Sequence, residues 1–225
     1  MNHCRSIRLA ISVLPVLLSS CAMFGDSRPG VAKVEDLVSR VERVHVETEL
    51  ARDAAAAAVR ELRALTAPGF RGDAAGSYRA VSAAAEASRQ HAIQLRESVS
   101  AMQIAAQPVF DQWAAQVDAI GNASVRARSE DRLRRARERY TAIDSNLRPA
   151  LDEFDALNCD VRDLLLFLSV DFNSASVATI QTELANLDGS VARLDARLGR
   201  SLVAAQGYLE VAARRGDEAL ATPAR

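Results

Sequence analysis

Few residues in this chain have the type and spacing needed for metal or acid–base chemistry. Beyond residue 20 there are two histidines, His45 and His91, and Glu42 stands three residues before His45. A Glu-x-x-His pair on a helix is the spacing of di-iron bundles, which need the motif on a second helix and two further carboxylates. Ala87 and Ser88 stand four and three residues before His91, so half of such a site is missing. With no Gly-rich phosphate loop or nucleophile elbow either, we predict that the protein is not an enzyme and binds no metal or cofactor.

The first twenty residues differ from the rest of the chain. Arg5 and Arg8 are followed by the uncharged apolar run 9–18, an order typical of a secretory signal peptide. The run ends in Leu18-Ser19-Ser20-Cys21, which resembles the lipobox of bacterial lipoproteins, where the cysteine receives a thioether-linked diacylglycerol and becomes the new N-terminus. We therefore expect a signal peptide at 1–20 and lipidation of Cys21. An ordinary signal peptide cut at the same place and an uncleaved anchor are the alternatives.

The residues after Cys21 bear on the final location. Ala22 follows the cysteine, and by resemblance to sorted lipoproteins the absence of Asp there favours the outer membrane, facing the periplasm. Segment 21–30 contains Gly25, Pro29 and Gly30 and is predicted to be a flexible tether. Cys159 would then be the single free thiol of the mature chain, so no internal disulfide is expected.

Apolar and small residues recur at alternating steps of three and four along most of the chain. This spacing places them on one stripe of a helix, and a strict seven-residue repeat predicts left-handed supercoiling. Four such series occur, over residues 34–65, 78–120, 133–168 and 177–209. We predict an all-α fold, an elongated antiparallel four-helix coiled-coil bundle, with two stacked helical hairpins as the alternative arrangement.

Turn-forming residues separate the four series. Pro68-Gly69 follows the first, Gly121-Asn122 follows the second, and residues 171–176 follow the third. Gly, Pro and Asn favour turns, and Asn122 is also expected to cap the third helix. Short turns of this kind make successive helices antiparallel.

Three further features concern the course of the helices and the domain limits. Pro108 and Pro149 lie inside the second and third series and are expected to bend those helices. The fourth series is expected to shift by four residues at Leu202. The helical domain is predicted to span 31–213, followed by a disordered tail at 214–225.

One flank of the third predicted helix is rich in arginine and is a candidate site for phospholipid or another phosphate-bearing partner. Its members recur at steps of three and four: Arg128, Arg132, Arg135 and Arg139. The alternative is a solvated face that pairs with itself, through Glu130 with Arg134 and Asp131 with Arg135 at i,i+4 spacing. Nucleic acid is not an expected partner of an exported protein.

A candidate apolar surface lies near the end of the third series. Leu165, Leu166 and Phe167 fall off the seam, close in sequence to Phe172. Exposed apolar patches often mark interfaces, so these residues form either a docking surface for a partner or a core region covered by more helix. Cys159 falls at an outward position, where a free thiol either cross-links two copies or stays inert.

The middle of the chain resembles a known protein family. The resemblance is carried by the following residues: Phe110-Asp111-Gln112-Trp113, Asn122-Ala123-Ser124-Val125-Arg126, Ser129, Leu133, Arg137 and Tyr140. They are similar to the central signature of a bacterial family, domain of unknown function 2959, with Ala136 in place of its threonine. The resemblance spans roughly residues 33–210, and it implies a helical protein that often carries a lipoprotein leader, without an established activity, ligand or partner.

These features lead to one principal functional expectation and one alternative. We expect a non-enzymatic, lipid-anchored protein of the cell envelope that acts as a coiled-coil scaffold or spacer for a protein partner or for self-association. The alternative is a protein that binds lipid or an envelope polymer through the arginine flank of the third helix together with the apolar surface.

Overall fold

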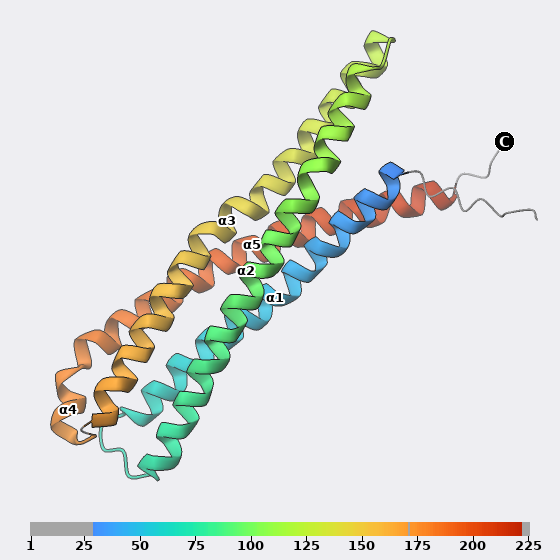
Figure 1. The fold of residues 1–225 in the computed structure, drawn as a ribbon. Helices are drawn as coiled ribbons and strands as arrows, with labels where there is room; N and C mark the ends of the chain where they lie inside the picture. The colour runs from blue at the N-terminus through green and yellow to red at the C-terminus, as the bar shows by residue number, and fades with distance from the viewer. Residues whose placement is uncertain (1–28, 171, 222–225) are drawn as a thin grey trace, which may run out of the picture.

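The computed structural model describes residues 29–170 and 172–221 of the chain. It contains the helices α1 (Pro29–Leu65), α2 (Ala74–Asp118), α3 (Ala123–Val170), α4 (Ser174–Thr179) and α5 (Gln181–Ala221) (Figure 1). No β-strand occurs in this part of the chain, so the prediction of an all-α fold is confirmed.

The four long helices form one ring of neighbours. Helix α1 packs against α2 and α5, and α3 packs against the same two helices. Ion pairs mark two of the seams: Arg96 of α2 bonds Asp155 of α3 at 2.6 Å, and Arg52 of α1 bonds Asp195 of α5. The arrangement is therefore a four-helix bundle with antiparallel neighbours, in which the two pairs of sequential helices, α1 with α2 and α3 with α5, share the most extensive contacts.

The core follows the predicted heptad positions closely. Every seam position of the first series from Leu37 to Leu65 is buried, and so is every position of the third series except the half-buried Tyr140. Val34, at the start of the first series, is 43% exposed. Because the seams of all four long helices meet, these residues form one continuous apolar cluster.

The fourth series differs from its prediction in two places. Its first turn is a separate short helix, α4, and the chain breaks at Ile180 before α5 begins. The predicted shift at Leu202 is also wrong, because Ser201 and Ala205 are buried while Leu202 is only half-buried. The buried positions of α5 keep their spacing of three and four residues beyond Leu198, and the small residues Ser201 and Ala205 occupy them.

The turns form where the sequence predicts them. Gly69 has a φ of +74°, a left-handed conformation that glycine adopts without steric cost. Asn122 caps α3, since its Oδ1 accepts hydrogen bonds from the backbone N–H groups of Ser124 and Val125 at 3.0 and 3.2 Å. Asn173 caps α4 in the same way.

The boundaries of the helical part extend somewhat beyond those expected. Helix α1 begins at Pro29, inside the segment assigned to the tether, and α5 continues to Ala221, inside the segment assigned to the tail. Helices α2 and α3 continue through Pro108 and Pro149. The signal peptide at 1–20 and Cys21 lie outside the described residues. None of the described helices is both long and apolar enough to span a membrane.

The two ends of the bundle are different. At one end the α2–α3 hairpin projects past the first turn of α1 and the last turn of α5 (Figure 1). The connections α1–α2 and α3–α4 lie together at the other end. The residues that begin and end the described chain therefore lie on the same side of the molecule as the tip of the α2–α3 hairpin.

Candidate functional site

The residues considered for metal chemistry do not converge. Glu42 is exposed, and His45 lies 3.6 Å from Glu49 Oε1 on its own helix. Within residues 29–170 and 172–221, no group of three His, Cys, Asp or Glu side chains is placed to hold a metal ion. The other two candidate surfaces, the arginine flank and the exposed apolar residues, lie at the two ends of the bundle.

At the end with the α1–α2 and α3–α4 connections, large apolar side chains reach solvent. Leu166, Phe167 and Phe172 are 59%, 42% and 36% exposed. Val170, which the sequence reasoning missed, is the most exposed of all at 87%. Phe70 joins them, because its ring makes an edge contact with Phe172 at a centroid distance of 6.4 Å. We call these five residues the apolar end.

Leu165 does not belong to the apolar end, and for this residue the alternative of a covered core position holds. Its side chain is only 7% exposed and forms part of the core, and its carbonyl oxygen accepts a hydrogen bond from the Tyr78 hydroxyl at 3.1 Å. Leu165 directly follows the seam residue Leu164, and both side chains belong to the core. Val170 lies two residues beyond Leu168, the last buried residue of α3, and Phe70 is found only from the fold.

At the opposite end, the tip of the α2–α3 hairpin carries the arginine flank. Arg128, Arg132 and Arg139 form no ion pair with any side chain that the structure describes, whereas Arg135 bonds Asp131. The predicted pair Arg135 with Asp131 is confirmed. We call residues 123–139 the basic tip.

The second pair expected on this flank is wrong. Arg134 bonds Asp131 at 2.5 Å and Glu138 at 2.7 Å, and it does not bond Glu130. Asp131 therefore forms ion pairs with two arginines, Arg134 and Arg135. Three of the four arginines of the flank are left with their charge uncompensated by described neighbours, and self-pairing accounts for only part of this surface.

Two other arginines hold the hairpin together. Arg126 Nε donates to the Ile120 carbonyl at 2.8 Å, and Arg137 donates to the Phe110 carbonyl at 3.3 Å. The Arg137 guanidinium also lies 5.9 Å from the centre of the Phe110 ring, and this ring packs on Tyr140 at 5.4 Å. Burial, and then the neighbouring Asp144, raise the pKa of Tyr140 to about 12. Phe110, Arg137 and Tyr140, which are among the residues that carry the family resemblance, therefore join α2 to α3.

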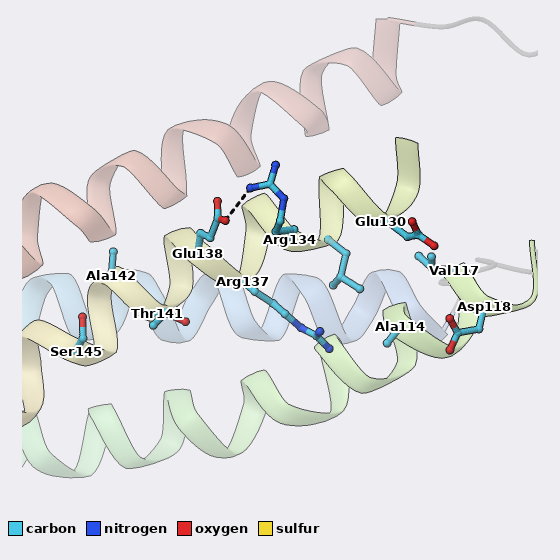
Figure 2. Close-up of a pocket in the computed structure, with 11 residues that line it drawn as sticks. Ala114, Val117, Asp118, Glu130, Arg134, Arg137, Glu138, Thr141, Ala142 and Ser145 are labelled. Atoms are coloured by element: carbon cyan, nitrogen blue, oxygen red, sulfur yellow. Dashed lines mark hydrogen bonds and ion pairs between the residues drawn. The ribbon is translucent and has the colours of Figure 1, made fainter. Parts of the chain in front are cut away.

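A shallow groove of about 730 Å³ runs along the outside of the hairpin near its tip (Figure 2). Ala114 and Val117 of α2 and Leu133 of α3 supply its apolar floor, Arg137 reaches across from α3, and Arg134 and Glu138 pair at its rim. Of its charged side chains, Arg134 and Glu138 bond each other and Arg137 bonds the Phe110 carbonyl. Asp118 and Glu130 also line the groove, together with the hydroxyl groups of Thr141 and Ser145.

A second groove of about 590 Å³ lies between α2 and α3 nearer the apolar end. It includes Cys159, which is exposed, and Glu86, whose pKa is lowered to about 2 by hydrogen bonds from Arg89 and Gln90. The carboxylate is therefore ionised and satisfied at neutral pH. Arg89 and Arg162 also line this groove, and no histidine does among the described residues.

The two predicted surfaces lie far apart. Arg132 and Leu166 are separated by 34 residues of the continuous helix α3, which corresponds to about 50 Å at ~1.5 Å per residue. The arginine flank and the apolar residues therefore do not form one composite site.

Comparisons with known proteins agree with the resemblance in the signature residues. The family model described as protein of unknown function (DUF2959) matches residues 26–211. No curated protein and no solved structure matches the chain. Since the family model covers most of the sequence, including all of the hairpin contacts described above, the chain belongs to the family of domain of unknown function 2959.

Proposed function

We propose that this protein is a non-enzymatic, lipid-anchored spacer of the cell envelope that presents its apolar end to a protein partner or to a second copy of itself. Cys21 is the proposed lipidation site, and the proposed location is the outer membrane, facing the periplasm. The charged and apolar parts of the leader and the Leu18-Ser19-Ser20-Cys21 motif support the anchor.

The main support for this proposal is the apolar end. Four of its five residues are exposed and Phe70 is half-buried, and all lie at the end of the bundle opposite Pro29, the first described residue. Soluble proteins rarely leave several large apolar side chains adjacent and exposed unless they bind something. Phe and other aromatic residues also dominate the energetics of protein interfaces. A surface of this composition, on the side away from the anchored terminus, suits a docking site for another protein.

The dimensions of the bundle suit a spacer. Helix α3 has 48 residues, which gives a length of about 70 Å. A core that continues along four helices resists bending better than a single helix would. An anchor at one end would then hold the apolar end at a defined distance from the bilayer.

A photo-crosslinking experiment tests the docking role. A photoreactive amino acid replaces Phe167 at the apolar end in the full chain, and in a matched control it replaces Val203, which is 74% exposed on the side of α5. We expect discrete adducts from position 167 and none from position 203. Masses of the adducts identify a second copy of the chain or one defined partner.

A second substitution tests whether the adduct depends on the apolar end. Changing Val170 to Ser beside the photoreactive residue should reduce the adduct several-fold, because it removes the most exposed apolar side chain of the surface. Equal labelling from positions 167 and 203, or adducts that are insensitive to the Val170 change, would contradict the docking role. Circular dichroism of each variant checks that the helices remain folded.

A further inference from the structure

The basic tip concentrates positive charge in a chain that is otherwise negative. Of 28 basic and 29 acidic residues, seven arginines and three carboxylates fall between residues 123 and 139. The tip is therefore strongly positive, and the remainder of the chain carries an excess of acidic residues. Such a distribution orients the molecule in front of a negatively charged surface.

The side chains needed for such a contact are free. Arg128 and Arg132 are exposed and have no ion-pair partner among the residues described. Val125, one turn earlier on α3, is 40% exposed beside them. Guanidinium groups form charge-assisted, often bidentate hydrogen bonds with phosphate oxygens, and an exposed apolar side chain favours the boundary between headgroups and acyl chains.

The position of the tip in the molecule indicates which surface it meets. The α2–α3 hairpin projects past Pro29 at the same end of the bundle (Figure 1). The eight residues from Cys21 to Pro29 reach at most ~28 Å when fully extended. A bilayer that held Cys21 would therefore lie close to the basic tip and far from the apolar end.

We propose that the basic tip, chiefly Arg128 and Arg132, binds the anionic phospholipid headgroups of the bilayer that holds the anchor. This inference rests on the proposed lipid anchor and adds a second contact with the membrane. Two contacts at one end fix the tilt of the bundle, whereas a single point of attachment leaves it free to lie flat. The apolar end is then held away from the membrane, where a protein partner reaches it.

Vesicle flotation tests the tip without relying on acylation. Residues 22–225 retain every described helix and the whole core that these helices form, so this chain is mixed with vesicles of phosphatidylcholine alone or with added phosphatidylglycerol. We expect binding only to the anionic vesicles, falling as salt is raised. Changing Arg128 and Arg132 to Glu should weaken binding about 25-fold or more, since each basic residue near an anionic surface contributes roughly a fivefold factor.

A matched control separates a local contact from a change in net charge. Arg71 and Arg79 are exposed and form no ion pair with described residues. Arg71 lies in the α1–α2 connection and Arg79 near the start of α2, at the end of the bundle opposite the basic tip. The double change of these two to Glu alters the net charge equally and should leave binding within about twofold. Equal loss in both double variants, or no binding of the original chain to anionic vesicles at low salt, would overturn the proposal. Failure of the Cys21 anchor is a separate result, because this chain carries no lipid.

Discussion

Two buried serines in the heptad seams show how much a single hydroxyl matters in this bundle. Ser88 is fully buried on α2 and donates a hydrogen bond from Oγ to Asn158 Oδ1 of α3 at 2.7 Å. Ser201 is 1% exposed on α5, and its Oγ has no hydrogen-bond partner in the described part of the chain. A satisfied buried hydroxyl stabilises the fold, whereas an unsatisfied one retains its desolvation cost.

The same substitution should therefore have opposite effects at the two positions. We expect Ser88→Ala to lower the free energy of unfolding by about 1–2 kcal/mol, because it leaves Asn158 without its donor, and Ser201→Ala to raise it by about 1 kcal/mol. Urea unfolding followed by circular dichroism measures both. A loss of stability at both positions would show that Ser201 finds a partner that the structure does not contain.

At the scale of the helices, small residues determine how closely α1 approaches α2. These two helices share the most extensive contact of any pair in the bundle. Ala51, Ala55 and Ala58 of α1 are all at most 2% exposed. Alanine in these positions lets the backbones approach, and the same positions have no room for a larger side chain.

Enlarging one of these alanines should destabilise the bundle. We expect Ala55→Leu to lower the free energy of unfolding by about 2–3 kcal/mol through overpacking. The neighbouring residue Ala56 is exposed, so Ala56→Leu should change stability by less than about 0.5 kcal/mol. Thermal and urea unfolding of both variants test this, and a neutral Ala55→Leu would mean that α1 and α2 separate easily.

Most of the helices were predictable because the heptad pattern is regular and is interrupted by Pro, Gly and Asn. The errors fall where local pattern and packing disagree. Leu202 is more apolar than Ser201, so the sequence favours a shifted stripe, but the packing of α5 buries Ser201 and Ala205 instead. Asn173 caps the short helix α4, and the chain leaves the helical conformation at Ile180 before α5 begins.

At the scale of the whole molecule, the sequence did not predict which surfaces come together. The sequence already places the arginine flank and residues Leu166 and Phe167 at opposite ends of one long helix, but only the fold shows that Phe70 joins the apolar end. Phe70 and Phe172 lie about a hundred residues apart and meet only because two connections share one end of the bundle. Contacts of this kind depend on the ring order of the helices, which heptad spacing leaves open.

The two ends together define how the molecule would act. In the proposed arrangement, the basic tip lies beside the anchored terminus and binds the membrane, and the apolar end on the other side binds a protein. The bundle between them, with its continuous core, keeps the two contacts apart. This orientation depends on attachment of the chain through Cys21.

Palmitate labelling of cells that express the full chain tests that attachment most directly. We expect the original protein to carry the label and to sediment with the membranes, and we expect Cys21→Ala to carry none, because it lacks the thiol that forms the thioether. A Cys159→Ala variant, which keeps Cys21, should be labelled like the original and controls for the loss of a thiol. An unlabelled original protein, or label that persists in Cys21→Ala, would contradict the account.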